Sequence, residues 1–547
     1  MKRKKNKNFR LVLLFLFALS GVVFYLIASG KISIDSGSKK ISIKEEEEVV
    51  NYKNCYAVLS NYEKYQKSIT LRELKSASIY TSSEQKEFFK AQGFKNVAAY
   101  ADATDGKLYP FLKENGNYLI VLPEDVDYRL KNLYVDGKFL WDKNDVAKYP
   151  LCFEMSEKLA KGDVQKFKDE NLYEHDGEYY NFDISSIGTI FAGGEIIPAR
   201  AVDRTWLNQS NNYTLLFDRL SKVISESDIA IAMLENPISG DPTPCKGCMM
   251  FVGDERNAQG FKQVGFDAFG IGNHFGDGGQ NAIDRTIKAL TENEIGLAGA
   301  STTTLEDTTK PVILEFKGRK VALLSAEDVS AYYWFGQDWG TNYYSTKSSS
   351  GGVGGVDAVK IQSDIAKAKE QADIVIVMMS WGTEYTNGAN SHQKELAHAI
   401  IDAGADMIVG SHPHWVQSIE IYKEKPILYS LGNFIFDQTG EGPGQDYSRR
   451  NGETRQGMTV QFFYYKDKMV SMDFIPHKMC GYDQVGGESY NKTRNLAWKV
   501  QAGEMTYAEV DQTPENQGCV WYQPTPVAEN SSSYSAIWKR VIEFSNI

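Results

Sequence analysis

The chain has 547 residues, a formal net charge of −11 at pH 7 and 42% hydrophobic residues, a length that suggests roughly two to four folded domains. Its acidic balance argues against a nucleic-acid-binding function, because nucleic acids are bound through basic surfaces. The 6 cysteines are an even number, which is compatible with disulfide bonds in an oxidising compartment. Their spacing leaves the pairing open.

The N-terminal segment predicts a membrane anchor. Residues 1–10 are rich in Lys and Arg, and residues 11–29 are uncharged and rich in Leu, Phe and Val. This apolar segment is close to the roughly 20 residues that span a bilayer and longer than the roughly 7–15 of a cleaved signal core. We therefore expect a single-pass signal anchor at 11–29 in the cell membrane, with the basic tail in the cytoplasm and the bulk of the chain outside it. A cleaved signal peptide is the alternative, and it places the rest of the chain outside the cytoplasm as well.

Beyond the anchor, the composition divides the chain into further segments. Residues 30–50 are rich in Ser and Lys and then in Glu, which predicts a solvated stalk. Residues 51–183 have apolar segments typical of a smaller α/β N-terminal domain of unknown role, and a faint likeness to phosphate-type solute-binding proteins leaves a receptor function open. From 184 to 480 strand and helix patterns alternate, and 481–547 form a C-terminal extension without a catalytic signature.

The alternating region predicts a layered fold. Several of its apolar runs are uninterrupted, as expected of strands that are buried on both faces. We therefore expect an α/β architecture, either α/β/α or a four-layered α/β/β/α sandwich, with functional residues on loops at the strand ends. The expected strands cover 189–192, 229–234, 268–272, 321–324, 374–379, 407–409 and 427–430, and the expected helices include 280–293 and 393–403.

Polar side chains follow four of these strands. His412 and His414, one residue apart just past a strand, can point both imidazoles into one cleft, as nitrogen ligands of a transition metal do. Each motif also has a structural interpretation: Glu235 as a loop charge, Asn273 as a turn cap, Glu384 as an ion-pair partner. Four such motifs together are hard to explain by packing. The polar residues are Glu235; Asn273, His274 and Asp277; Ser380, Trp381 and Glu384; and His412 and His414.

These motifs stand in the order of a known family. The segments that carry the resemblance are Leu234 to Pro237, Asn273 to Gly279, Trp381 to Tyr385, Asp402 to His414 and Tyr429 to Phe434. On them, residues 184–478 resemble the CapA or poly-γ-glutamate capsule synthesis family, a branch of the calcineurin-like metallophosphoesterase superfamily. The resemblance implies a metallophosphoesterase-like α/β/β/α sandwich. It also implies a role in capsule or exopolymer biosynthesis, in contact with a capsular or cell-envelope polymer or with its synthesis machinery.

The resemblance further implies a metal site. A divalent ion of the Mn, Zn or Fe type would polarise a phosphoryl or carbonyl oxygen and activate a water molecule. The implied roles are metal ligand for Glu235, Asn273, His412 and His414, proton donor for His274 and anion binding for Arg200, with Asn433 at the cleft.

Two positions depart from the family pattern. Gly194 stands where the family has a metal-binding aspartate on the first strand, and Ser380 stands where it has a histidine. Glu195, one residue along, is a further candidate for the cleft, because its longer side chain could reach back to this position. Strand alternation, however, predicts that the side chain points to the opposite face. Since each ligand supplies charge and geometry, we expect a weakened site.

Two functions remain open on this basis. One is a metal-dependent hydrolase or transferase that keeps residual activity through the surviving ligands. The other is an inactive scaffold that binds a cell-envelope polymer or an assembly partner. The aromatic segment 331–340 favours the scaffold somewhat, because aromatic loops make stacking platforms for sugars and flat apolar groups.

Overall fold

The computed structural model of the chain describes most residues from 46 onward. The predicted anchor at 11–29 and the aromatic segment 331–340 lie outside the described residues, as do Cys245, Cys248, Cys480 and Cys519. No helix in the described part of the chain is long and apolar enough to cross a membrane. The described residues are 32–34, 41–43, 46–64, 66–100, 108–115, 117–200, 202–203, 214–240, 251–304, 306–329, 352–353, 358–437, 451–479, 499–500, 503–506, 509, 523–529 and 531–543.

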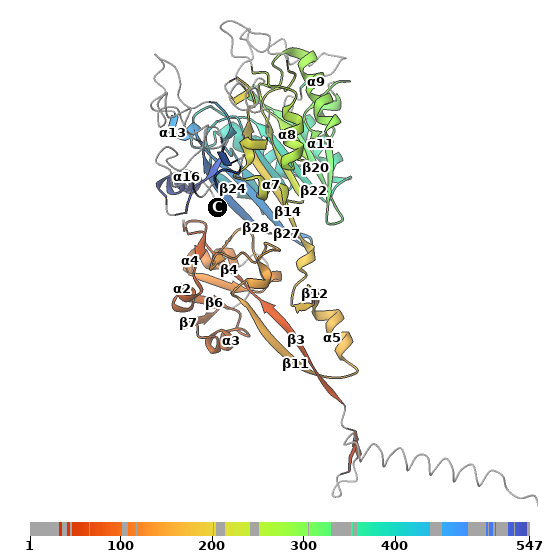
Figure 1. Ribbon diagram of the computed structural model, residues 1–547, viewed down its shortest axis with the longest axis vertical. Coiled ribbons are helices and arrows are strands. Elements are labelled where there is room, and N and C mark those ends of the chain that lie inside the picture. The colour runs from red at the N-terminus through yellow and green to blue at the C-terminus, as the bar shows by residue number, and fades with distance from the viewer. Residues whose placement is uncertain are drawn as a thin grey trace, which may run out of the picture. The chain divides into compact units, whose positions relative to one another are not determined.

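The chain divides into two compact units, each described here by itself (Figure 1). The first contains the residues up to Ala57, together with Leu122–Glu124 and Lys138–Ser185; the rest of the chain forms the second. A disulfide in the first unit joins Cys55 to Cys152, its register partner on the neighbouring strand. The first unit is built on a sheet of order β11-β3-β13-β12, made of β3 (Glu47–Cys55), β11 (Cys152–Ala160), β12 (Tyr173–His175) and β13 (Glu178–Tyr180), with the helix α5 (Val164–Asn171).

Among the described residues, the second unit contains two large sheets, a five-stranded sheet and two sheets of two strands each. The two-stranded sheets pair β5 (Ser68–Ile69) with β10 (Tyr134–Val135) and β18 (Ala300–Ser301) with β21 (Gly352–Val353). The five-stranded sheet has the order β7-β6-β8-β4-β9. Its strands are β4 (Ala57–Ser60), β6 (Ser78–Thr81), β7 (Asn96–Ala99), β8 (Tyr118–Val121) and β9 (Lys131–Asn132), accompanied by the helices α2 (Leu71–Ser76), α3 (Lys86–Ala91) and α4 (Leu108–Asn115).

The first large sheet has the order β17-β16-β15-β14-β27-β28-β29, with β26 also paired to β14. Its strands from β14 to β17 run parallel, and β27 and β28 run antiparallel to their neighbours. The strands are β14 (Ile187–Ile196), β15 (Ile229–Leu234), β16 (Ala268–Ile271), β17 (Gly296–Leu297), β26 (Asn433–Ile435), β27 (Gln456–Tyr465), β28 (Lys468–Lys478) and β29 (Thr525–Pro526).

The second large sheet has the order β19-β20-β22-β23-β25-β24. Its strands β20, β22, β23 and β25 are parallel, so their carboxyl ends meet at one edge. The strands are β19 (Val312–Phe316), β20 (Arg319–Glu327), β22 (Ile374–Ser380), β23 (Met407–Ser411), β24 (Ile419–Tyr422) and β25 (Lys425–Leu428).

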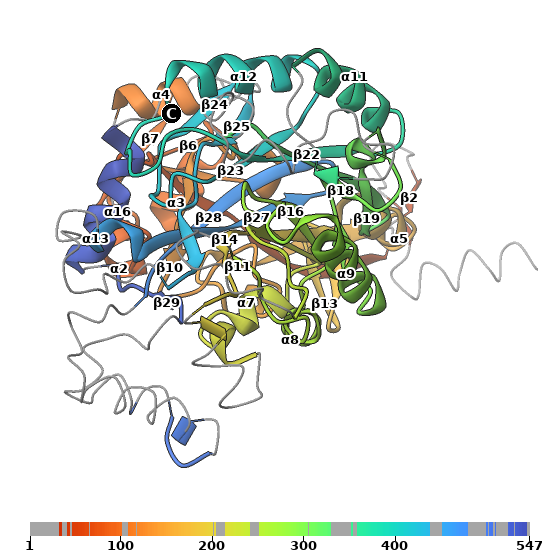
Figure 2. The ribbon, with the colours of Figure 1, turned by 90° about the horizontal axis from the view of Figure 1, so that it is seen from above.

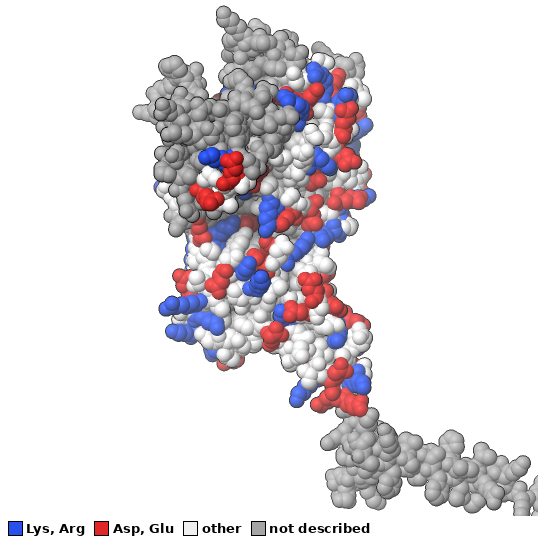
Figure 3. Space-filling view, in the orientation of Figure 1, with Lys and Arg blue, Asp and Glu red and all other residues white. Residues whose placement is uncertain are grey.

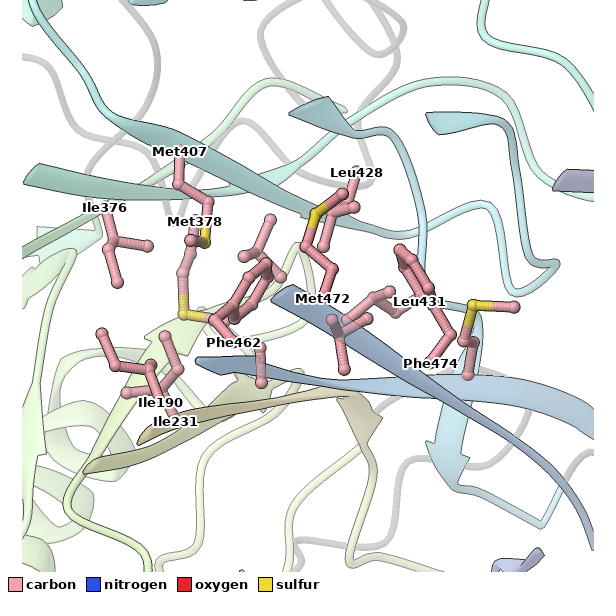
Figure 4. Close-up of a cluster of buried hydrophobic side chains, with 14 of the residues drawn as sticks. Ile190, Ile231, Ile376, Met378, Met407, Leu428, Leu431, Phe462, Met472 and Phe474 are labelled. Atoms are coloured by element: carbon pink, nitrogen blue, oxygen red, sulfur yellow. The ribbon is translucent and has the colours of Figure 1, made fainter. Parts of the chain in front are cut away.

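The two large sheets pack face to face through a shared apolar core, which we call the inter-sheet core (Figure 4). Ile190 and Ile231 of the first sheet and Ile376, Met378 and Met407 of the second belong to it. Burial of one such side chain is worth about 2 kcal/mol, and the strand period of two directs alternate residues into this core. Where a strand continues past its last residue in the inter-sheet core, the residue two positions further on points to the same face of the sheet. That side chain then lies at the carboxyl end of the strand, between the two sheets.

Helices cover the outer face of each large sheet, which gives four layers (Figure 2). The helices on the first sheet pack on Phe191 and Phe269, and those on the second sheet pack on Val375 and Val377. The α/β class is therefore confirmed, with its layers in the order helix, sheet, sheet, helix. The helices are α7 (Ser221–Ser225), α8 (Asn257–Val264) and α9 (Gly279–Glu292) on the first sheet, and α11 (Ala358–Lys369) and α12 (Ser391–Asp402) on the second.

Charged side chains of both signs are interspersed over the face drawn in Figure 3. No single-sign stripe of Lys and Arg is visible among the described residues on that face.

Candidate functional site

Polar side chains gather at the carboxyl ends of the two large sheets, on the side of the inter-sheet core. On β15, Ile231 and Met233 lie in that core, so the next residue on the same face is Glu235. On β23, Val409 lies in the core, and Ser411 follows on the same face just before His412. The sequence and the strand period together thus place these side chains at one edge of the sandwich.

The first strand carries an irregularity that corrects the expectation for Glu195. In the pairing of β14 with β15, Ala192 faces Ile231 and Glu195 faces Met233, so β14 has one residue more than its partner over this stretch. Such a β-bulge reverses the alternation of the residues that follow it. Accordingly, Ala192 lies in the inter-sheet core but Ile196 lies in the core on the outer face. Glu195 therefore points into the site rather than away from it.

Glu195 contacts both histidines of the His-Pro-His segment. Its Oε2 lies 2.7 Å from Nδ1 of His414, and its Oε1 accepts a hydrogen bond from the backbone N–H of His412. Nδ1 of His414 is also 3.0 Å from Oδ1 of Asn433. Burial, the largest influence, lowers the pKa of His414, but Glu195, Glu384 and Asn433 together raise it to about 9. Without a bound cation, the structure thus favours an ion pair between Glu195 and His414.

His412 is held in a different electrostatic state. Its Nδ1 lies 3.2 Å from Oδ1 of Asn273. Burial, assisted by His414 and His274, lowers the pKa of His412 well below its usual value, so its imidazole is neutral and able to bind a metal. The φ angles of His412 and His414 are 89° and 59°. These left-handed conformations are costly for non-glycine residues and indicate that the surrounding contacts fix the segment.

Glu235 is the most unusual carboxylate of the site. It is fully buried, and neither of its oxygens has a hydrogen-bond partner of ordinary geometry among the described residues. Burial raises its pKa well above the usual value, and the charges of Glu195 and Glu327 raise it further, while the backbone of His274 opposes the shift. A Cβ at Gly272 would lie 1.7 Å from Oε2 of Glu235, so the glycine is required for this carboxylate to fit. The ionised form of such a buried group is stable only when it is paired with a positive charge or bound to a metal.

Glu327 is a buried site residue that the sequence analysis missed. The expected strand ended at Leu324, whereas β20 continues to Glu327. Val321 and Leu323 lie in the inter-sheet core, so the period of two carries the same face through Ser325 to Glu327. That period was the signal that could have identified Glu327, had the strand been extended across Ser325.

Ser380 and Trp381 point to opposite faces of the second sheet. Ser380 is fully buried on the inter-sheet side, in register with Glu327 on one neighbour and Ser411 on the other. Trp381 lies in the outer core, under the helices, and its indole N–H donates to the carbonyl of Tyr429 at 2.8 Å. The structure therefore brings Ser380 into the site and places Trp381 on the other face of the sheet, where it supports packing.

The loops above the sheets supply the remaining predicted residues. Nδ1 of His274 lies 3.1 Å from Oδ2 of Asp277, which also accepts the backbone N–H of Phe251 at 2.7 Å. Glu384 is exposed, and its charge acts on His414 from the edge of the site. Its neighbour Tyr385 stacks on the imidazole of His414 at a centroid distance of 5.8 Å.

Arg200 is positioned by contacts on both sides of its guanidinium group. It forms an ion pair with Asp437, with Nε 3.1 Å from Oδ2. The guanidinium carbon lies 4.6 Å from the ring centre of Phe251 and 5.5 Å from that of Phe436. Phe251 also contacts His274 edge to face, at 4.4 Å. Arg200 thus stands beside the His274 loop, partly exposed, with its charge shared with Asp437.

The donor set fits a divalent cation in its chemistry. No group of three or more His, Cys, Asp or Glu side chains within the described ranges already has the arrangement of a metal site. However, buried carboxylates, a neutral imidazole and an amide oxygen lie together at this edge, and among the described residues Glu235 has no hydrogen-bond partner of ordinary geometry. Opening the Glu195–His414 ion pair would free one carboxylate and one imidazole as ligands. A cavity of about 370 Å³, lined among others by Asp373, Asp406 and Tyr464, lies at the amino ends of β22 and β23, away from these residues.

Comparison with known proteins gives a family match over the region that contains the site. Residues 189–438 match the family described as bacterial capsule synthesis protein PGA_cap. The chain is 27% identical over 337 residues to the PGA biosynthesis protein CapA of Bacillus subtilis (strain 168), which covers 60% of this chain and 83% of that protein. It is 31% identical over 292 residues to the capsule biosynthesis protein CapA of Bacillus anthracis, which covers 52% of this chain and 65% of that protein.

Solved structures give weaker likenesses. A putative 5′-nucleotidase from Staphylococcus aureus in complex with alpha-ketoglutarate has a TM-score of 0.33 and 14% identity, over 53% of this chain and 54% of that one. The sulfate thiohydrolase SoxB of Thermus thermophilus in complex with glycerol has a TM-score of 0.29 and 12% identity, over 58% and 60% of the two chains. At these scores the likenesses support no conclusion about activity.

Proposed function

Because residues 189–438 belong to the bacterial capsule synthesis family PGA_cap, we propose that the chain is a membrane-anchored, extracytoplasmic protein of capsule or exopolymer biosynthesis, of the poly-γ-glutamate type. Its curated relatives are named for PGA and capsule biosynthesis. In this proposal the segment 11–29 anchors the chain, and the site at the strand ends acts on a cell-envelope polymer or on its synthesis machinery. Removal of residues 1–30 should release the protein from the membrane fraction.

Within this process, we assign the site a metal-dependent hydrolase or transferase reaction of the metallophosphoesterase kind. Glu195, Glu235, Asn273, His412 and His414 are the residues that would hold a divalent cation. When bound, such a cation supplies Lewis-acid polarisation of a phosphoryl or carbonyl oxygen and a water molecule of lowered pKa. The observation that carries the assignment is the β-bulge, which turns Glu195 towards the histidine pair. In this proposal the carboxylate of Glu195 takes the place of the one missing at Gly194.

The chain's own residues supply proton transfer and charge complementarity. Asp277 holds Nδ1 of His274 through its carboxylate, and in the imidazolium form of this ring Nε2 carries the proton that would pass to a leaving-group oxygen. Phe251 fixes the imidazole from its side and also stacks beneath Arg200. Arg200, oriented by Asp437, can pair with an anionic group of the substrate next to that proton donor.

Hydrolysis of bis(p-nitrophenyl) phosphate by the full-length protein in the presence of Mn²⁺ tests this reaction class. We expect Mn²⁺-dependent hydrolysis that falls by about 100-fold in His274→Gln, because a general acid contributes about that factor or more. His175→Gln, at a half-buried imidazole of the first unit, is the matched control and should leave the rate unchanged. Mn²⁺ binding without any hydrolysis would instead support the second function, a scaffold that binds a polymer or partner.

A further inference from the structure

We propose that Glu327 is a metal-site residue of this chain that takes the place of the imidazole lost at Ser380, and that the resulting carboxylate-rich centre selects Mn²⁺ or Mg²⁺ over Zn²⁺. The inference rests on the proposed metal site. It concerns a residue that the family motifs do not contain. It also narrows the expected metal, from Mn, Zn or Fe to a hard cation that prefers oxygen ligands.

The sheet register places Glu327 directly beside the substituted position. Glu327 on β20 is the register partner of Ser380 on β22, and both side chains continue the inter-sheet face of their strands, after Leu323 and Met378 respectively. The pairing extends one residue further, because the backbone N–H of Asp328 donates to the carbonyl of Ser380 at 2.8 Å. Glu327 therefore stands on a rigid strand end, one strand spacing from the place where the family has its imidazole.

A second contact ties this strand end to the loop that carries Asn273. The hydroxyl of Ser325 accepts a hydrogen bond from the backbone N–H of Ile271 at 3.0 Å. Ser325 lies two residues before Glu327 on the same face, and Ile271 lies two residues before Asn273. The ends of β20 and β16 are thus held together across the two sheets, which brings the fully buried Glu327 to the side of the site opposite the histidine pair.

The cluster of buried carboxylates favours a bound cation. Glu195, Glu235 and Glu327 are all fully buried, and the charges of Glu195 and Glu327 both act on Glu235. Glu235 has no hydrogen-bond partner of ordinary geometry for either oxygen, and the buried hydroxyls of Ser380 and Ser411 have none among the described residues. Buried carboxylates are stable when they pair with a positive charge or coordinate a metal.

The donor types decide which ion is preferred. Carboxylate, amide and water oxygens suit Mg²⁺ and Mn²⁺, whereas imidazole-rich sites suit Zn²⁺. Relative to the family pattern, this chain exchanges one imidazole at Ser380 for the carboxylate of Glu327 and keeps a carboxylate, Glu195, in the place of the aspartate. The proposed ligand set therefore contains more oxygen donors and more negative charge than the ligand set of the family motifs.

Thermal unfolding of the full-length, chelator-treated protein with MnCl₂, MgCl₂ or ZnCl₂ tests the role of Glu327. In wild type, we expect Mn²⁺ to raise the midpoint of unfolding, since a ligand that binds only the folded form stabilises it. Glu327→Gln keeps the size of the side chain and removes its charge. We expect it to raise the midpoint of the metal-free protein, because it removes repulsion among carboxylates, and to weaken apparent Mn²⁺ binding about 10-fold or more.

Two further variants separate the possible results. Glu315→Gln, at an exposed glutamate of the adjacent strand β19, is the matched control. It should change neither the unfolding midpoint of the metal-free protein nor the apparent Mn²⁺ binding. Glu327→Gln combined with Ser380→His should regain metal stabilisation, with the preference moved towards Zn²⁺. If Glu327 has a purely structural role, Glu327→Gln should lower the unfolding midpoints of the metal-free and the Mn²⁺-containing protein by the same amount. That result would overturn the inference.

The proposed site and this inference fail in different ways. If Glu235→Gln abolishes Mn²⁺ stabilisation while Glu327→Gln leaves it unchanged, the metal site stands and the role of Glu327 is wrong. If wild type gains no stability from any of the three ions, the proposed metal site itself is wrong. A wild type stabilised most strongly by ZnCl₂ would contradict the inferred metal preference.

Discussion

At the scale of single residues, the ion pair between Glu195 and His414 determines how the site responds to pH. In the metal-free protein Glu195, 2.7 Å away, stabilises a proton on His414, and together with Glu384 and Asn433 it outweighs the opposing effect of burial. Glu235 acts in the same direction, because its raised pKa keeps a proton in the folded state that the unfolded chain has already released. Both groups therefore bind more protons when folded than when unfolded.

The metal-free protein should consequently lose stability as the pH rises from 6.5 to about 9. The folded pKa of His414 is raised to about 9 from 6.5, so its contribution is fully present below pH 6.5 and disappears as the pH passes the folded value. The expected loss is on the order of 2–3 kcal/mol of unfolding free energy. Urea unfolding of wild type and His414→Gln at pH 6 and pH 9 measures it. Equal pH dependence in the two proteins would show that His414 is not the responsible group.

The sequence predicts which side chains lie at the site better than it predicts their orientation and their partners. The ends of apolar strands correctly indicated Glu235, Asn273, His412 and Ser380 as side chains of one edge, because parallel strands share a carboxyl end. Trp381 was assigned to the cleft by its motif alone, and the strand period puts it on the other face. The partner of each group, such as Asn433 for His414, depends on contacts between segments far apart in the chain.

At the scale of elements, the β-bulge in β14 is the feature that a single sequence did not reveal. The expected strands 229–234 and 374–379 agree closely with β15 and β22, because continuous apolar runs mark strands buried on both faces. In β14, however, Gly193 and Gly194 occupy positions where no side chain records which face is buried. The period of two therefore could not show that one residue is extra, and it assigned Glu195 to the wrong face.

The bulge predicts opposite results for two changes at Gly194. A Cβ at this position would lie 2.1 Å from the carbonyl oxygen of Gly432, so Gly194→Asp cannot restore a ligand and should destabilise the protein by about 1–3 kcal/mol or more. Deletion of Gly194 restores the regular alternation and still leaves Glu195 on the inter-sheet face. We expect the deletion variant to keep Mn²⁺-dependent stabilisation in thermal unfolding. Its loss, together with normal stability of Gly194→Asp, would mean that the bulge has no such role.

At the scale of the whole molecule, the two units are stabilised by different means. The first unit has a small core and a disulfide between Cys55 and Cys152, with a sequence separation of 97 residues. The second has the large cores of the two packed sheets and the candidate site. Cross-links that close long loops stabilise a fold by several kcal/mol, since they restrict the unfolded chain. A metal bound at the candidate site and the disulfide should therefore act on different units.

Calorimetry of the full-length protein checks this separation. The double variant Cys55→Ala/Cys152→Ala should lower the unfolding free energy of the first unit by about 4 kcal/mol and leave the Mn²⁺-induced shift of the second unit intact. The single variant Glu235→Gln should behave in the reverse manner, with the Mn²⁺-induced shift lost and the first unit unaffected. A disulfide variant that also loses the metal response would show that the two units do not unfold independently.

The central claim is that this chain keeps a metal site although Gly194 and Ser380 replace two family ligands. Isothermal titration of chelator-treated, full-length protein with MnCl₂ tests it most directly, with wild type and Glu195→Gln compared at pH 7.5. Gln at this position can still accept the backbone hydrogen bond from His412, so the fold should be kept. We predict saturable binding in wild type that is weakened by about 10-fold or more in Glu195→Gln. No binding in wild type, or equal binding in both proteins, would contradict the claim.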